Sequence, residues 1–216
     1  MILNVLLDNY IKISSEEKAN VVSHVIALLI LLGCIPILLF KAISLGSTSS
    51  IVGIGIFSLM ILFCYASSVR YHLANDSSDK YQWRRIDHIC IYLLIGGSYT
   101  GYILRFMDTP EGHMFLGFHW LIIILGIFKK IWFTGRFEII SVLSYLFLGW
   151  MVVFIYDDIV PQMNDVTYNL LWIGGLIYSF GVIFYTWNKL RYNHFIWHIF
   201  VFGGTFCHVL SLWSSL

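Results

Sequence analysis

Two histidines near the end of the chain, His194 and His198, are spaced so that both imidazoles can reach one metal ion. Residues four apart on a helix lie on one face, about one turn from each other. His72 follows Ser68 at the same spacing, and Asp87 comes shortly after. Three neutral imidazoles with an open fourth position are a common arrangement for catalytic zinc. A carboxylate beside the ion could hold or deprotonate the water that the ion activates, or orient a ligand.

The same residue types leave two alternatives open. An HxxxH pair by itself can be two interfacial histidines that share no ligand, and a series of His and Asp side chains can relay protons without a metal. Ser68 shares a helix face with His72 and could hydrogen-bond to the site, but a bond to its own helix backbone accounts for a serine there equally well. Whether these residues form one site depends on whether the secondary-structure elements that carry them bring them to one place.

The composition shows what those elements are. Of the 216 residues, 59% are hydrophobic and only 12% are charged, whereas soluble domains carry roughly 25% charged residues. The chain is therefore an integral membrane protein, and its net charge of +1 excludes a nucleic-acid binder. Seven apolar stretches approach the ~20 residues that span a bilayer. They are expected as helices at about 20–44, 50–71, 87–106, 113–130, 138–156, 166–186 and 195–214.

The distribution of basic residues predicts the orientation of the chain. Eleven of the thirteen lie in the N-terminal tail or in the connectors that share its side of the membrane, and only Lys41 and Arg105 lie near the other side. Because basic residues accumulate on the cytoplasmic side, the N-terminus should be cytoplasmic and the C-terminus outside. The prediction is one all-α membrane domain over residues 1–216, a seven-helix bundle with residues 1–19 as a cytoplasmic tail. In this topology His72, Asp87 and the HxxxH pair share the cytoplasmic end.

The remaining histidines are expected to lie outside the metal site. His208 follows His198 by ten residues and should lie roughly 15 Å deeper, too far to share the ion. His24 lies about one turn inside the first span, near enough to support a ligand. His88 points roughly 100° away from its neighbour Asp87, so solvent or a lipid headgroup is its expected contact. His113 and His119 are expected at the outer membrane interface.

Four blocks of sequence carry a resemblance that covers residues from about 16 to the C-terminus. They are EKANVVSH at 17–24, SVRYH at 68–72, DHICIYLLIGGSYT at 87–100 and HFIWHIFVFGGTFCH at 194–208. In this order they resemble the hemolysin III proteins of bacteria, which are similar to the progestin and adipoQ receptor family. The four together are specific, although no single block is. One departure is Gly101, where the bacterial pattern usually has proline, and it puts a helix kink in doubt.

The resemblance implies a seven-helix bundle with a cytoplasmic N-terminus in a bacterial cell membrane. It also implies Zn²⁺ held by His72, His194 and His198, with Asp87 touching the zinc-bound water. Relatives include receptors for a protein hormone and ceramidase-like hydrolases of lipid amides. Bacterial members carry a hemolysin label and have been connected with membrane lipid homeostasis.

Three functions remain open at this point. The first is a zinc-dependent hydrolase of lipid amides, or a sensor of membrane lipids, with Asp87 as base and Ser68 at the catalytic site. Its partners would be membrane lipids, and a small lipid substrate or ligand would enter from the bilayer. The second is a pore-forming cytolysin, which would need a polar lining, whereas the deep polar residues of this sequence are few and cluster at one end. The third is a receptor-like regulator in which zinc only holds helices together.

Overall fold

The structure is a computed structural model that describes residues 2–216, with side chains from Leu6 onward. Its helices are α1 (Ile2–Lys12), α2 (Ser15–Leu45), α3 (Thr48–Leu73), α4 (Ser77–Phe106), α5 (Pro110–Phe133), α6 (Glu138–Trp150), α7 (Tyr156–Ile159), α8 (Asp165–Thr186) and α9 (Asn193–Ser215), with 3-10 turns η1 (Met151–Ile155) and η2 (Val160–Gln162) on either side of α7. Within the described residues, seven helical segments are long and apolar enough to cross a membrane. The predicted seven-span all-α bundle is confirmed.

Short polar caps explain where five of these long helices begin. Ser14, Ser47, Asp76, Thr109 and Asn164 precede α2, α3, α4, α5 and α8, and each side-chain oxygen accepts a backbone N–H from the first turn. Such caps satisfy donors that the helix itself cannot pair. Because the caps lie in connectors of only a few residues, consecutive helices run antiparallel and stay neighbours.

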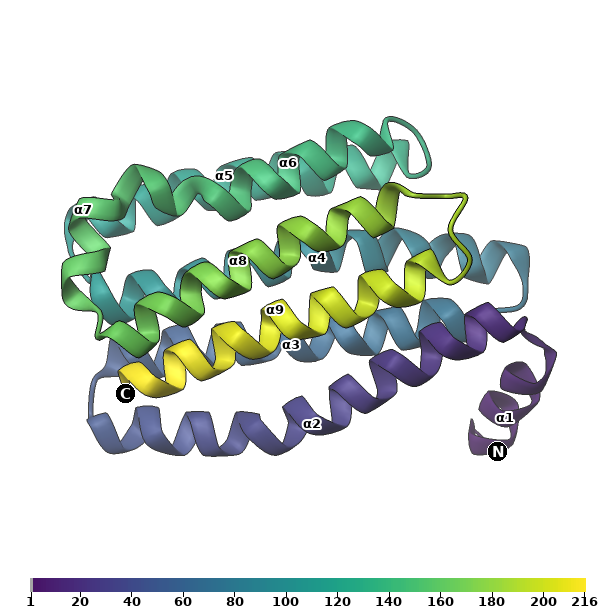
Figure 1. The fold of residues 1–216 in the computed structure, drawn as a ribbon, viewed down its shortest axis with the longest axis horizontal. Helices are drawn as coiled ribbons and strands as arrows, with labels where there is room; N and C mark the ends of the chain where they lie inside the picture. The colour runs from purple at the N-terminus through teal and green to yellow at the C-terminus, as the bar shows by residue number, and fades with distance from the viewer. Residues whose placement is uncertain (1) are drawn as a thin grey trace.

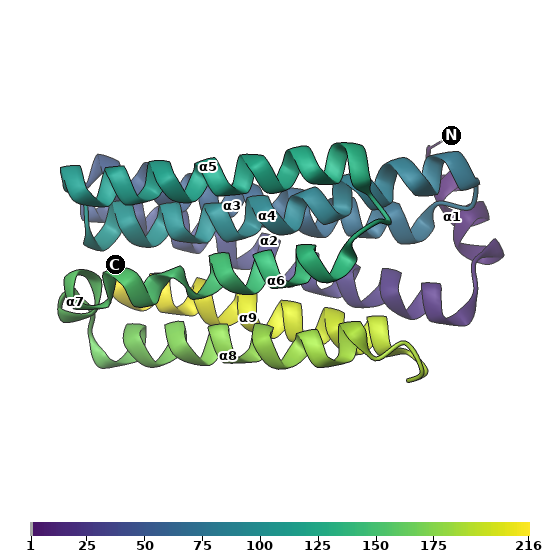
Figure 2. The ribbon, with the colours of Figure 1, turned by 90° about the horizontal axis from the view of Figure 1, so that it is seen from above.

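The helices are arranged so that the last span returns to the first. The span α9 packs between α8 and α2, which closes the sequential series of helices into a ring (Figure 1). The C-terminus and α1 lie at opposite ends of the bundle in both views (Figures 1 and 2). A chain that crosses the membrane an odd number of times has its two ends on opposite sides, which agrees with this placement. The end that carries α1 also carries the α3–α4, α5–α6 and α8–α9 connectors, and most of the basic residues lie in these connectors or on the helix ends at this end of the bundle.

Close contact between α3 and α4 depends on two glycines. A Cβ at Gly53 would lie 3.0 Å from the carbonyl oxygen of Thr100 and 3.3 Å from the Cα of Gly101. The two backbones can approach this closely because neither position carries a side chain. Gly101, the departure from the bacterial pattern, thus lies inside an uninterrupted α4 at a helix contact.

Two segments differ from the prediction. The region expected as a tail contains the helix α1 and the first residues of α2, although residue 1 lies outside the described residues. The fifth span, expected as one helix over 138–156, leaves α-helical geometry after Trp150. Tyr99 stabilises this break, because its hydroxyl donates to the carbonyl of Gly149 and accepts from the backbone N–H of Val152, at 2.9 and 2.6 Å.

Candidate metal centre

The three histidines of the predicted metal site lie together at the end of the bundle that carries α1. His72 is in the last turn of α3, and His194 and His198 are in the first two turns of α9. One ring nitrogen from each lies within 4.8 Å of the other two. His72 and His198 are only 1% and 3% exposed, and His194 is half-buried. This cluster could bind a metal ion.

The start of α9 is anchored to the start of α2. Tyr192 precedes α9 with φ 59°, a left-handed conformation that is uncommon for a residue with a side chain. Its backbone N–H donates to Glu16 Oε1 at 3.4 Å, and Arg191 Nε lies 4.0 Å from the same oxygen. The sharp turn allows the first residues of α9 to face the bundle, where His194 meets His72.

Glu17 on α2 orients the ring of His72. Its Oε2 lies 2.5 Å from His72 Nδ1, and its Oε1 accepts from Lys80 Nζ at 2.5 Å. When Nδ1–H donates to the carboxylate, Nε2 presents its lone pair. That Nε2 is buried and has no hydrogen-bond partner among the described residues. An unpaired buried acceptor costs free energy, and a metal ion would satisfy it. The residues present therefore fit a metal ion.

The same face of α2 supports His198. Ser23 Oγ lies 3.0 Å from His198 Nδ1 and also donates to the Asn20 carbonyl oxygen. His24, 4% exposed, places its ring 3.7 Å from that of His198, centroid to centroid. Both ring nitrogens of His24 are buried without a hydrogen-bond partner in the described part of the chain. His24 thus supports the cluster by ring contact, as its depth in the first span predicts.

Asp87 and Ser68 lie beside the cluster. Both are buried, and the Asp87 carboxylate lies near Ser68 and His72. Asp87 comes from α4 and Ser68 from the turn of α3 that precedes His72. Together with His198, both side chains line one cavity. A carboxylate and a hydroxyl therefore face the space next to the three imidazoles.

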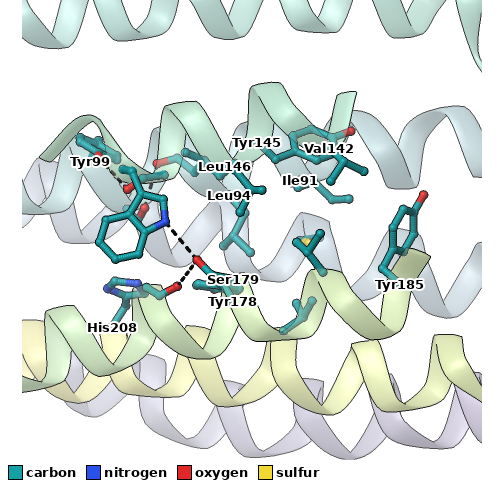
Figure 3. A pocket seen from close by; sticks show the side chains of 18 of the residues that line it. Ile91, Leu94, Tyr99, Val142, Tyr145, Leu146, Tyr178, Ser179, Tyr185 and His208 are labelled. Carbon is teal, nitrogen blue, oxygen red and sulfur yellow. Dashed lines mark hydrogen bonds between the residues drawn. The ribbon is translucent and has the colours of Figure 1, made fainter. Parts of the chain in front are cut away.

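This cavity extends from the histidine cluster along the interior of the bundle. Its empty space amounts to about 1490 Å³, which includes the part that is open to the surroundings. Tyr185 lies toward the end near the cluster and His208 toward the other, with apolar side chains such as Leu94, Val142 and Leu146 between them (Figure 3). The α6 helix, which forms one wall, packs only loosely on its neighbours. The cavity is long and mainly apolar, which suits a hydrocarbon chain.

Two of the remaining histidines do not lie where the sequence suggested. His88, expected at solvent or a headgroup, is buried, and its Nδ1 lies 3.1 Å from Lys130 Nζ. Lys130 is only 1% exposed and donates to Glu138 Oε2 at 2.6 Å. His119, expected at the interface, is 0% exposed, with its ring 4.0 Å from that of Tyr99. Both predictions were wrong because they used helix angle and depth without the neighbouring helices. Lys130 of α5 lies against His88, and Tyr99 of α4 and the Leu148 carbonyl of α6 lie against His119.

The other two histidines agree with the depth argument. His113 is exposed at the start of α5, where Nε2 pairs with Asp108 at 2.7 Å. His208 lies outside the metal cluster and contacts Tyr102 and Tyr178 instead.

Glu17, Asn20 and Ser23 were not singled out as functional from the sequence, although their block carried the resemblance. Polar residues at 20, 23 and 24 each lie three or four residues after another polar residue, at 17 or 20, at the start of an otherwise apolar span. That spacing places them on one helix face. It indicates a face directed at a polar partner and could have identified these residues. The partner histidines, however, come from the far ends of other helices.

Comparison with known proteins agrees with this architecture. A family model described as Haemolysin-III related matches residues 13–209. The chain is 35% identical over 190 residues to the Hemolysin-3 homolog of Bacillus subtilis (strain 168), which covers 88% of this chain and 89% of that protein. It is 34% identical over 190 residues to Hemolysin-3 of Bacillus cereus, at 88% and 87% coverage. Similarity to the human Monocyte to macrophage differentiation factor is weaker, 26% over 172 residues, which covers 78% of this chain and 70% of that protein.

The family model covers the three clustered histidines, Asp87 and the α2 face that supports them. Seven apolar helices together with these bacterial relatives define a multi-pass protein of the cell membrane. The chain belongs to the haemolysin-III related family of integral membrane proteins.

Proposed function

We propose that this protein is a zinc-dependent hydrolase that cleaves an amide or ester bond of a membrane lipid. The observation that carries the proposal is the placement of three histidine nitrogens within 4.8 Å of one another at the end of a long apolar cavity. His72, His194 and His198 would hold the ion. Three imidazole ligands leave the fourth position that a catalytic zinc site needs.

A zinc ion held there would supply Lewis-acid chemistry, polarising a carbonyl group and making water a better nucleophile. In this proposal Asp87 would accept the proton that water loses as it attacks the carbonyl carbon. The carboxylic acid can then return that proton to the leaving nitrogen or oxygen, so that the acid and the amine or alcohol are released. Ser68 lies beside Asp87 and is a positioning residue that holds the carboxylate toward the cavity.

The cavity selects the substrate class. Its lining is mainly apolar and aromatic, so it favours a hydrocarbon chain over a soluble metabolite. The connectors are short and form no soluble domain, the longest between spans running from 187 to 192. We therefore propose a single domain over residues 1–216 and a small lipid that enters from the bilayer. The distribution of basic residues supports a metal end at the cytoplasmic leaflet, with the N-terminus inside and the C-terminus outside.

Two further candidates share the fold. The name of the Bacillus relatives favours a cytolysin, although an apolar lining does not suit an ion-conducting pore. A lipid sensor or receptor-like regulator with a purely structural zinc would use the same histidines without turnover. These two candidates do not need Asp87 to accept a proton, whereas the hydrolase does.

The deciding experiment compares Asp87→Asn with the native protein in detergent, with zinc content and lipid-amide hydrolysis measured on the same samples. Asparagine keeps the size but cannot accept a proton at neutral pH. A hydrolase should keep its zinc and lose on the order of 10²-fold in turnover. Asp158→Asn, an exposed carboxylate at the other end of the bundle, is the matched control and should behave as native. Undiminished hydrolysis by zinc-loaded Asp87→Asn would refute the proposal.

Dye release from lipid vesicles tests the cytolysin. Native protein that releases dye without hydrolysing any lipid, with Asp87→Asn equally active, would favour lysis over catalysis. Zinc retention with neither hydrolysis nor dye release would favour the sensor.

A further inference from the structure

A buried ion pair lies close to the cavity, at the end that holds the histidine cluster. Lys130 of α5 is 1% exposed, and its ammonium group donates to Glu138 Oε2 at 2.6 Å. The backbone N–H of Gly135 donates to Glu138 Oε1 at 3.0 Å, and Arg84 Nη2 lies 3.5 Å from the same oxygen. An ionisable residue inside a membrane bundle is costly to keep and by default marks a function. Neither metal ligation nor proton transfer by Asp87 requires this pair.

The lysine fixes the tautomer of a neighbouring histidine. Lys130 Nζ also lies 3.1 Å from Nδ1 of His88, which is 5% exposed on α4. Because an ammonium group can only donate, Nδ1 accepts, and the proton of the neutral ring is on Nε2. A second positive charge at this distance would be repelled, so the ring stays neutral. His88 is therefore held as an imidazole whose N–H is at Nε2.

This N–H faces the cavity. The side-chain nitrogens among residues 6–216 that are both buried and unpaired do not include Nε2 of His88. Since Nε2 also has no hydrogen-bond partner in that part of the chain, it keeps accessible surface, and the cavity is the free space that His88 borders. Tyr145, also on the cavity wall, donates from its hydroxyl to the His88 carbonyl oxygen at 3.0 Å. A donor without an acceptor is thus presented to the cavity.

The donor lies next to the proposed catalytic groups. Asp87 and His88 are consecutive residues of α4, so their Cα atoms are about 3.8 Å apart. His194 lies near His88 as well. The apolar part of the cavity, which suits the hydrocarbon chain, begins further along α4, at Ile91 and Leu94. A group that reaches the His88 N–H therefore belongs to the polar head of a lipid and not to its chain.

We propose that His88, held as a donor by Lys130, binds an oxygen atom of the lipid head group, a hydroxyl or a carboxylate oxygen on the leaving side of the cleaved bond. The inference rests on the proposed function in placing the scissile bond at the histidine cluster. An oxygen acceptor satisfies the N–H, whereas an alkyl group leaves it unpaired. An ammonium group, which can only donate, gains nothing over an alkyl group.

The test is a binding measurement on four amides of palmitic acid that differ only in the group two carbons beyond the amide nitrogen. The group is a hydroxyl, a carboxylate, a methyl or an ammonium. Each amide competes with a fluorescent fatty acid for the full-length protein in detergent micelles, and mass spectrometry confirms that the amide is intact afterwards. Relative to the methyl compound, native protein should bind the hydroxyl compound about fivefold more tightly and the carboxylate compound about tenfold more tightly. The ammonium compound should show no such gain.

Variants separate the donor from the fold around it. His88→Phe keeps an aromatic ring without a donor, and it should bind the methyl compound as native does but lose the preference for oxygen. His88→Gln places an amide N–H near the same point and should keep part of the preference. Lys130→Met combined with Glu138→Gln removes both charges and frees the tautomer, so it should reduce the preference. His113→Phe, at an exposed histidine at the start of α5, is the control and should leave the preference unchanged.

Equal binding of the methyl, hydroxyl and carboxylate compounds by native protein would overturn the subsite, and so would a preference that survives in His88→Phe. If His88→Phe does not fold, an unchanged preference in the Lys130→Met, Glu138→Gln double variant would overturn the proposal instead. Native protein that binds none of the four would overturn the lipid cavity together with the subsite. A preference for oxygen in a protein without hydrolytic activity would support the head-group subsite while the proposed hydrolase fails.

Discussion

Glu17 is predicted to set the metal affinity of this protein without touching the ion. Its carboxylate lies 2.5 Å from His72 Nδ1, a charge-assisted contact of the strong kind. Glu17→Gln keeps the size and one acceptor oxygen, but it removes the charge that raises the basicity of His72 and leaves Lys80 without its carboxylate partner. Loss of such a supporting group typically weakens metal binding by about 10–100-fold, or about 1.4–2.8 kcal/mol.

The assay is zinc competition between the purified full-length protein and a chromophoric chelator, with thermal unfolding of the metal-free forms as a check on folding. Glu16→Gln is the matched control, because Glu16 is the neighbouring carboxylate but contacts Tyr192 and Arg191 instead of a candidate ligand. Glu17→Gln that binds zinc within twofold of native would refute the reasoning. Equal losses in Glu16→Gln and Glu17→Gln would show that the start of α2 acts only through its fold.

Three further outcomes are expected. Metal analysis should find about one zinc per chain, lost in His198→Ala but kept in His208→Ala; equal loss in both would contradict the depth argument. A reporter fused after Leu216 should be active outside the cell, and activity only in the cytoplasm would reverse the orientation. Glu138→Gln should destabilise the bundle by about 3 kcal/mol in thermal unfolding, because it leaves the buried Lys130 ammonium without a carboxylate partner. Adding Lys130→Met should restore much of that loss, and a double variant no more stable than Glu138→Gln would argue against a buried ion pair.

The seven spans and the histidine cluster could be predicted because each depends on local spacing. Hydrophobic length defines a span, and the spacing of His194 and His198 defines a shared helix face. His72 could be added to the predicted cluster once the membrane topology placed it at the same depth as His194 and His198. The surroundings of His88 and His119 could not be predicted, because burial depends on which helices pack beside a given face. The end of α6 at Trp150 could not be predicted either. The hydroxyl that replaces its helical hydrogen bonds belongs to Tyr99, which lies on another helix, α4.

The support of the cluster by α2 has a consequence for how the protein is made. The residues that orient the imidazoles lie in the first span to leave the ribosome, and two of the three imidazoles lie in the last. A chain released before Asn193 would carry only His72 of the three clustered histidines, and Glu17 would contact a candidate ligand that lacks the other two. If the cluster holds an ion as proposed, metal capture has to await completion of translation and the docking of the final helix against the first. An early-terminated product would be unable to hold the ion, which makes metal loading a readout of full-length assembly in the membrane.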